Sequence, residues 1–279
     1  MGTLYVVGTP IGNMGDITFR AVNTLRSVDL ICAEDTRVTQ KLLNHYDISK
    51  PLISYHEHNA AAVGGSICDR IAAGENAAIV TDAGMPCISD PGEQLVKLCA
   101  ERGIPVEVVP GPSACVSALA VSGLDTARFA FEGFLPVEKK ERNARLAAAS
   151  MKEETLIFYE APHKLEKTLA DMLEYFGDRR ISLCRELTKL HEEVMRTTIS
   201  GSVLYFGQHG NRPRGEYVLV VEGAKEPPQE SEQTIEGALA QVKTLAANGM
   251  RPADACREIA KVTPFSKGEL YTAFLEEKQ

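Results

Sequence analysis

The sequence predicts an α/β protein with two α/β domains followed by a small helical extension. Short apolar runs alternate with helical patterns along the first 120 residues, which is typical of a mostly parallel sheet with helices on its faces. This alternation begins again near Gly123, and a polar segment with two adjacent prolines then precedes three short helical patterns. We therefore expect domains at residues 1–122 and 123–225, a linker at 226–234 and a helical extension at 235–279.

Strands and helices follow one another in the first domain. Short β-type apolar runs predict strands at 4–7, 30–33, 52–55, 77–81 and 106–109. The periodic patterns between them predict helices at 17–28, 63–73 and 93–102. Gly74 and Gly103 follow the last two helices, where a helix C-terminus favours a residue that tolerates positive φ.

The second domain and the extension give similar but shorter signals. Apolar runs predict strands at 129–134, 155–159, 181–184 and 217–221. Beyond the polar segment, helices are predicted at 235–247, 253–262 and 267–276, and the breaks between them fall at glycine and proline.

Composition places the chain among ordinary globular proteins. Its 279 residues are 44% hydrophobic and carry a formal net charge of −8, which argues against disorder and against binding nucleic acid or an anionic membrane through an overall positive field. There is no signal-peptide pattern and no apolar run of the roughly 20 residues that a membrane span needs. The seven scattered cysteines form no C-x-x-C pair, so we expect a cytoplasmic protein with free thiols and no metal centre.

Three glycine- and proline-rich loops follow predicted strands, at 8–16, 81–86 and 110–114. In an open parallel sheet, loops at the carboxyl ends of the strands form the ligand crevice, and glycine lets the backbone approach a ligand closely. Any one of these loops alone is an ordinary βα turn, but their joint occurrence predicts a small-molecule site. The first loop lacks the Gly-Lys-Ser/Thr of a P-loop and has Pro10 where a dinucleotide fingerprint needs glycine, which disfavours nucleoside triphosphates and NAD.

A series of motifs in fixed order resembles the tetrapyrrole methylase superfamily, and within it the branch that acts on ribosomal RNA. The first loop reads Gly-Thr-Pro-Ile-Gly, whereas tetrapyrrole-modifying relatives tend to have Gly-x-Gly-Pro-Gly, and this difference favours the RNA branch. The matching segments lie at 4–13, 33–37, 56–59, 81–84, 89–92, 110–114, 132–136, 158–163, 185–189 and 214–217.

The resemblance implies two α/β domains with S-adenosylmethionine in the cleft between them. It further implies 2′-O-methylation of a cytidine ribose in the decoding region of 16S rRNA, within the small ribosomal subunit, by a homodimer. Carried over position by position, the cofactor-binding residues are Pro10, Ile11, Asp82, Ala83, Gly84, Met85, Ser113, Ala114, Tyr159 and Glu216.

Methyl transfer to a ribose hydroxyl depends on in-line positioning and on a group that accepts the proton or stabilises the forming alkoxide. Within the matching motifs, the catalytic candidates are Glu34, Asp35, His56, Glu186 and Lys189.

Each candidate has a structural alternative. Asp35 is equally suited to capping the helix that follows it, and His56 with His58 resembles a metal pair that lacks further ligands. Glu186 is suited to an internal ion pair with Arg185, and Lys189 to a solvated surface position. Asp82 is either a turn former or a ligand contact, and its place in a glycine loop favours the contact.

Basic residues collect in the second domain despite the negative overall charge. The segment 194–215 contains three arginines and no acidic residue, and further basic residues follow Pro136. Such clusters are suited to RNA phosphates, although a cluster of charge is often only a solvated surface. The RNA-binding candidates are Arg37, Lys139, Lys140, Arg142, Arg145, Arg196, Arg212 and Arg214.

Two other functions stay open at this point. The first is a methyltransferase of the same fold that acts on a small tetrapyrrole. The second is a non-catalytic RNA-binding assembly factor, which would bind no cofactor.

Overall fold

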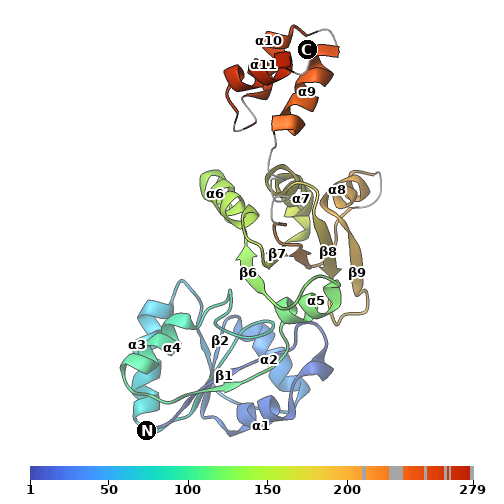
Figure 1. Cartoon of the computed structure of the whole chain (residues 1–279). Coiled ribbons are helices and arrows are strands. Elements are labelled where there is room, and N and C mark those ends of the chain that lie inside the picture. The colour runs from blue at the N-terminus through green and yellow to red at the C-terminus, as the bar shows by residue number, and fades with distance from the viewer. Residues whose placement is uncertain (209–211, 226–234, 248–249, 261–262, 264, 277–279) are drawn as a thin grey trace. The chain divides into compact units, whose positions relative to one another are not determined.

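The computed structural model describes residues 1–208, 212–225, 235–247, 250–260, 263 and 265–276, and it divides into two compact units (Figure 1). The first unit, Met1–Ala224, contains two five-stranded sheets, and the second, Lys225–Gln279, contains three helices. The predicted linker at 226–234 lies outside the described residues. The predicted division after residue 122 stays a prediction, because both sheets belong to one compact unit.

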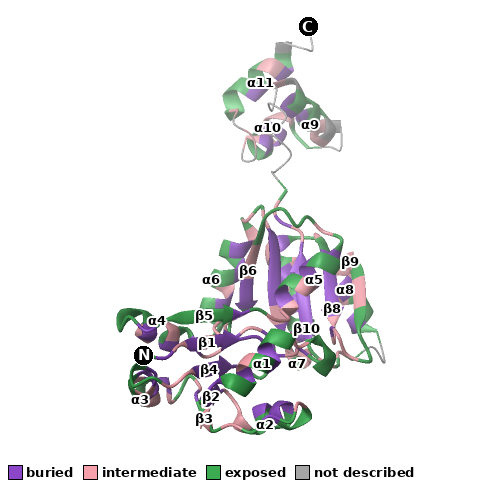
Figure 2. Cartoon of the chain, turned by 90° about the horizontal axis from the view of Figure 1, so that it is seen from below, coloured by how far each residue is buried: buried purple, intermediate pink, exposed green. Residues whose placement is uncertain are grey.

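The first sheet has the parallel arrangement that the alternating pattern predicts. Its strands, in the order β3-β2-β4-β1-β5, all pair in parallel. They are β1 (Leu4–Val7), β2 (Leu30–Ala33), β3 (Leu52–Ser54), β4 (Ala77–Val80) and β5 (Val106–Val109). Every residue of β2 and β4 is buried, which explains their continuous apolar runs (Figure 2).

The helices of this sheet are α1 (Phe19–Ser27), α2 (Thr36–His45), α3 (Ala60–Ala72) and α4 (Glu93–Glu101). The helix predicted from residue 17 begins only at Phe19, because the Thr18 side chain caps it by accepting a hydrogen bond from Ala21 N–H. A short 3-10 helix, η1 (Met14–Asp16), precedes it.

The second sheet is mixed, with the order β6-β7-β10-β8-β9. Only β6 and β7 pair in parallel, and the other three pairs are antiparallel. Its strands are β6 (Phe129–Phe134), β7 (Thr155–Glu160), β8 (Arg180–Arg185), β9 (Glu193–Thr198) and β10 (Tyr217–Val221). The prediction missed β9, because this edge strand has no fully buried residue and so no apolar run.

Alternate residues of the second sheet face different cores. Leu183 and Leu219 pack in a core with residues of α6 (Lys139–Ser150), α7 (Pro162–Phe176) and α8 (Ile199–Gly207). Cys184 and Val218 point to the other face, where they pack with α5 (Ala114–Ser122) and with Ile11 of the first loop. Ile11 therefore joins the first loop directly to the second sheet.

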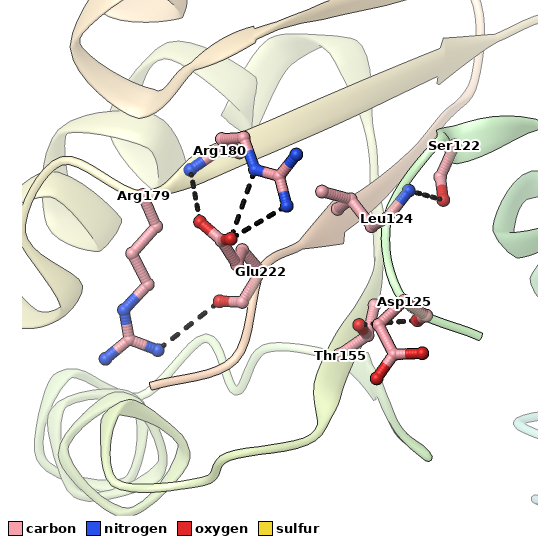
Figure 3. A network of polar contacts seen from close by, with 7 residues as sticks. All are labelled: Ser122, Leu124, Asp125, Thr155, Arg179, Arg180 and Glu222. Carbon is pink, nitrogen blue, oxygen red and sulfur yellow. Dashed lines mark hydrogen bonds and ion pairs between the residues drawn. The ribbon is translucent and has the colours of Figure 1, made fainter. Parts of the chain in front are cut away.

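A polar network fixes the end of the second sheet where β8 begins and β10 ends (Figure 3). The Glu222 carboxylate accepts hydrogen bonds from the Arg180 guanidinium at 3.1 and 2.9 Å, and the Glu222 carbonyl accepts one from Arg179 at 3.5 Å. The Thr155 hydroxyl donates to the Asp125 carbonyl at 2.7 Å, which ties the start of β7 to the segment that connects the two sheets. These residues are structural.

The second unit is a small helical bundle formed by α9 (Ile235–Ala247), α10 (Pro252–Ile259) and α11 (Lys267–Glu276). Leu239, Val242, Cys256 and Leu270 are among the residues that form its core. The helix predicted at 253–262 ends at Ile259, and residues 261–262 lie outside the described residues. Among the described helices, none is long and apolar enough to cross a bilayer. All seven cysteines are free thiols.

Candidate functional site

Three glycine-containing loops at the carboxyl edge of the first sheet contact one another, as their positions predict. Thr9 and Gly84 exchange backbone hydrogen bonds of 2.9 and 3.2 Å, which joins the first loop to the second. Gly8 touches the third loop so closely that a Cβ atom at this position would lie 2.7 Å from Gly111 Cα and 2.7 Å from Met85 Sδ. Glycine is therefore required at position 8 by contact between loops.

A group of four carboxylates adjoins these loops. Glu34 accepts a hydrogen bond from the Thr81 hydroxyl at 2.6 Å, and Asp82 accepts one from the Asp35 backbone N–H at 3.1 Å. Asp90 lies near enough to Thr81 and Glu34 for both to affect its pKa. The structure thus brings together Glu34, Asp35 and Asp82 from the predicted set, and it adds Asp90.

The four carboxylates differ in environment. Burial first, and then the negative charge of Glu34, raise the pKa of Asp90 to about 6, although the nearby Thr81 hydroxyl acts in the opposite direction. Burial also raises the pKa of Asp82. Asp35 has a pKa lowered to about 2, because its carboxylate accepts hydrogen bonds from Arg37. One of these bonds, from Arg37 N–H at 2.8 Å, caps α2, which confirms the capping alternative for Asp35.

Asp90 lies in a loop that contacts the second sheet. The loop is conformationally constrained, since Cys87 and Ser89 have φ values of 71° and 61°. Ser89 Oγ lies 3.1 Å from the position of a Cβ atom on Gly133 of β6. Asp90 was not a catalytic candidate above, although it falls within the matching segment 89–92.

A second polar cluster lies beside the first loop and is formed by Glu186, Lys189 and Glu216. Lys189 Nζ makes ion pairs with Glu186 Oε1 at 2.9 Å and Glu216 Oε2 at 2.6 Å. Glu186 Oε1 also accepts a hydrogen bond from Glu216 N–H at 3.0 Å. The Lys189 stem covers Gly12, where a Cβ atom would lie only 2.5 Å from Lys189 Cγ.

This cluster overturns two alternatives stated above. Lys189 is partly buried and paired, and is therefore not a solvated lysine. Burial lowers its pKa, but its hydrogen bonds to Glu216 and Glu186 have the larger effect, so the pKa of Lys189 is raised. Arg185 pairs with Glu193 at 3.3 Å rather than with Glu186, because neighbouring residues of β8 and the turn after it point to different faces. The Glu186 pKa is lowered, first by the Glu216 N–H and then by Lys189.

A cavity of about 40 Å³ lies between the first loop, the start of α5 and the end of the second sheet. Its lining includes Ile11, Ala114 and Glu216 of the predicted cofactor residues, together with Glu186 and Lys189 of the catalytic candidates. Pro10 and Ala83 lie in the loops but do not line it.

The N-terminus of α5 at this cavity donates a hydrogen bond to a side chain of a strand and none to that of its own N-cap residue. Ser113, at the N-cap position, makes no side-chain capping hydrogen bond. Tyr159 reaches across from β7, and its hydroxyl accepts a hydrogen bond from Cys115 N–H at 3.1 Å. Ser113, Ala114 and Tyr159 therefore meet at the start of one helix, although they come from separate motifs.

Comparison with known proteins agrees with this architecture. Residues 3–201 match the family model described as Tetrapyrrole (Corrin/Porphyrin) Methylases. A protein of Synechocystis named Ribosomal RNA small subunit methyltransferase I is 45% identical over 279 residues, which cover 99% of this chain and 98% of the relative. The protein of the same name from Bacillus subtilis is 46% identical, with 98% of this chain and 94% of the relative covered.

The chain belongs to the ribosomal RNA small subunit methyltransferase I family.

One further relative and one solved structure are also similar to this chain. The Ribosomal RNA small subunit methyltransferase I of Thermotoga maritima is 49% identical over 225 residues, which cover 80% of this chain but 99% of that relative. The crystal structure of uroporphyrin-III-C-methyltransferase from Thermus thermophilus has a TM-score of 0.56 at 20% identity, and covers 79% of this chain and 94% of that one. The latter likeness concerns the fold alone.

Among the described residues of this methyltransferase I family member, no hydrogen bond or ion pair joins the His56 side chain to either polar cluster. Its backbone N–H donates to Asn59, its Nδ1 is buried and has no hydrogen-bond partner in the described part of the chain, and its ring centre lies 6.0 Å from that of His58. No group of three or more side chains suited to hold a metal ion occurs among the described residues.

The basic residues predicted to bind RNA in this family member fall into three groups. Arg142 was a wrong candidate: it is buried, pairs with Asp171 at 2.8 Å and donates to Thr168 at 2.7 Å, so no phosphate can reach it. Three others are exposed but already have partners. Arg37 forms an ion pair with Asp35 and Arg145 with Glu132, and Arg196 donates hydrogen bonds to the carbonyls of Val121 and Ser122. The remaining four are exposed and make no ion pair with a described residue: Lys139, Lys140, Arg212 and Arg214.

Proposed function

We propose that this chain transfers a methyl group from S-adenosylmethionine to the 2′-hydroxyl of a cytidine in the decoding region of 16S rRNA. The observation that carries the proposal is the 45% identity, over 99% of the chain, to a relative named Ribosomal RNA small subunit methyltransferase I. The proposal includes the small ribosomal subunit as substrate, a cytoplasmic location and a homodimeric state.

The residues at the three loops fit S-adenosylmethionine. At the N-terminus of α5, Ser113 makes no capping hydrogen bond and Tyr159 occupies only the Cys115 N–H, so neighbouring backbone N–H groups are suited to the carboxylate of an amino-acid moiety. Carboxylates near the loops suit its ammonium and sulfonium charges. The cavity of about 40 Å³ has room for one end of such a molecule. When bound, this cofactor supplies the electrophilic methyl group.

The chain contributes orientation and a proton acceptor. Holding the ribose hydroxyl in line with the methyl group supplies most of the rate gain, and the rigid contacts between the loops serve that purpose. We assign proton acceptance to Asp90, because a carboxyl with a pKa of about 6 is largely ionised at neutral pH yet more basic than an ordinary aspartate. Lys189 stays protonated between its two carboxylates and positions Glu216 and the first loop.

The test is transfer of tritiated methyl groups to 30S subunits, naked 16S rRNA and a porphyrinoid precursor. We expect label in 16S rRNA, recovered as 2′-O-methylcytidine after nuclease digestion. Label only in the porphyrinoid would favour the tetrapyrrole methyltransferase, a second candidate that shares the family model. No label, together with no heat of S-adenosylmethionine binding in calorimetry, would favour a non-catalytic RNA-binding factor.

Asp90→Asn tests the assigned proton acceptor within the same assay. We expect a fall in kcat on the order of 10²–10⁴-fold with little change in cofactor affinity. Asp47→Asn is the matched control, because Asp47 is exposed and has a φ of 54°, which asparagine adopts as readily. An unchanged kcat for Asp90→Asn would remove Asp90 from the reaction.

A further inference from the structure

We propose that a second cavity, of about 240 Å³, binds a single nucleotide of the RNA next to the one that is methylated. This inference rests on the proposed function. The cavity is formed by β8, β9, α8 and the segment that leads into β10, all within the first unit. Its volume is below the roughly 300–1,000 Å³ of typical pockets for drug-sized ligands, which suits one nucleotide.

The charge of the cavity lining favours an anion. Three guanidinium groups, those of Arg185, Arg212 and Arg214, face one carboxylate, that of Glu193. Glu193 is already paired with Arg185, whereas Arg212 and Arg214 are exposed and make no ion pair with a described residue. Arg185 Nε is buried and has no hydrogen-bond partner among the described residues, so a donor remains for a ligand.

Aromatic rings make up much of the remaining wall and favour a nucleotide over an acidic peptide. Tyr205 and Phe206 make an edge-to-face contact with ring centres 5.1 Å apart, and Phe206 meets Tyr217 at 6.2 Å. Tyr205 is 40% exposed, which makes it the most accessible of the three aromatic residues in the lining. Arginine with exposed aromatic surface is the combination that binds phosphate and base of single-stranded RNA.

The position of this cavity links it to the cofactor loops. Arg185 and Arg214 line the larger cavity, whereas Glu186 and Glu216, one and two residues further on, line the smaller cavity beside Ile11. In the same way, Tyr217 lines the larger cavity and Val218 lines the smaller one. The two cavities therefore lie on opposite faces of the ends of β8 and β10, and an RNA strand that crosses these ends reaches both.

The test uses the full chain and a fluorescein-labelled tetraribonucleotide, with affinity measured by anisotropy over a range of salt concentrations. We expect Arg214→Glu to raise Kd at least tenfold and to reduce the salt slope by about 0.7, as for one lost phosphate contact on a single strand. Lys97→Glu is the matched control, because Lys97 is an exposed lysine of α4 and the change in net charge is the same. Arg212→Glu repeats the test in case Arg214→Glu does not fold.

Competition experiments identify the ligand class. A normal tetranucleotide should compete at least fivefold better than an abasic one, and this difference should disappear in Tyr205→Leu. The proposal would be overturned if the charge-reversal variants Arg214→Glu and Arg212→Glu both had the same Kd as Lys97→Glu. It would also be overturned if an acidic peptide competed as well as RNA.

The binding assay and the methylation assay test the two proposals independently. Methylation by the wild type with no arginine-dependent oligonucleotide binding overturns the cavity proposal and leaves the proposed function intact. Arginine-dependent binding by a chain that methylates no RNA supports the cavity and overturns the function.

Discussion

Asp90 combines three features that no short motif displays together. It is half-buried, it lies close to Thr81 and to the negative charge of Glu34, and its loop touches β6 through Ser89 and Gly133. A carboxyl in such a place is less stable when ionised, so the free energy of unfolding should depend on its protonation.

The pH dependence follows from the sign of this shift. The pKa of Asp90 rises from 3.8 to about 6 on folding, so its contribution to stability is complete below pH 3.8 and is lost as pH rises through 6. We expect Asp90→Asn to raise the free energy of unfolding at pH 8 by about 1 kcal/mol, a value reduced for solvent screening of a half-buried group. Urea unfolding at pH 4 and pH 8 checks this, and Asp47→Asn should change stability at neither pH.

Lys189 is held by two carboxylates, and its removal leaves both beside the first loop without a counter-charge. We expect Lys189→Met to lower the free energy of unfolding by about 1–2 kcal/mol at pH 7, less than for a fully buried pair because the Lys189 side chain is 29% exposed. The folded-state pKa of Glu186 is lowered, so its stabilisation is present above its usual pKa of 4.5 and is lost as pH falls through the lowered value.

The loss in Lys189→Met should therefore shrink in acid, which denaturant unfolding at pH 7 and pH 3 measures. Lys167→Met is the control, because Lys167 forms an exposed i,i+4 pair with Asp171 and its loss should cost less than about 0.5 kcal/mol. Equal destabilisation by the two variants would mean that the Lys189 cluster is an ordinary surface pair.

The contact between the first and third loops fixes the carboxyl edge of the first sheet. Gly8→Ala forces a Cβ atom against the Gly111 backbone, which cannot move aside as a flexible side chain does. We expect a loss of about 1–3 kcal/mol in the free energy of unfolding and a weaker affinity for S-adenosylmethionine.

Gly65→Ala is the matched control for this loop variant. A Cβ atom there lies 3.7 Å from the Arg102 guanidinium, an ordinary contact, and Gly65 is inside α3, where alanine favours the helix by up to about 1 kcal/mol. Thermal unfolding of both variants and cofactor calorimetry provide the measurements. Equal stability of Gly8→Ala and wild type would show that the loops separate easily.

The two units of the whole molecule have separate cores. The residues that form the core of the second unit lie in α9, α10 and α11. The Thermotoga maritima relative aligns over 225 residues that make up 99% of its length, so a family member exists without about a fifth of this chain.

We expect a chain of residues 1–225 to unfold cooperatively, with the same Tm as the first unit has in the full protein. Differential scanning calorimetry of the truncated and the full chain checks this. The difference between their circular dichroism spectra should have the shape of a helical spectrum. A truncated chain that unfolds at least 10 °C lower would show that the first unit depends on the second.

The sequence by itself determined the first sheet, the loops at its carboxyl edge and the family. These features depend on local patterns: buried parallel strands are continuous apolar runs, and glycine marks the turns that follow them. Most of the cofactor residues predicted from the motifs lie in these loops for the same reason.

Only the tertiary structure decided which charged residues are partnered and which are free. Arg142 is buried because Asp171, 29 residues away, neutralises it, and Lys189 is enclosed because it covers Gly12, 177 positions earlier. Burial and then the charge of Glu34 raise the pKa of Asp90. Arg185 and Glu186 line different cavities because they point to opposite faces. Burial and counter-charges are set by residues distant in the chain, so a local pattern cannot specify them.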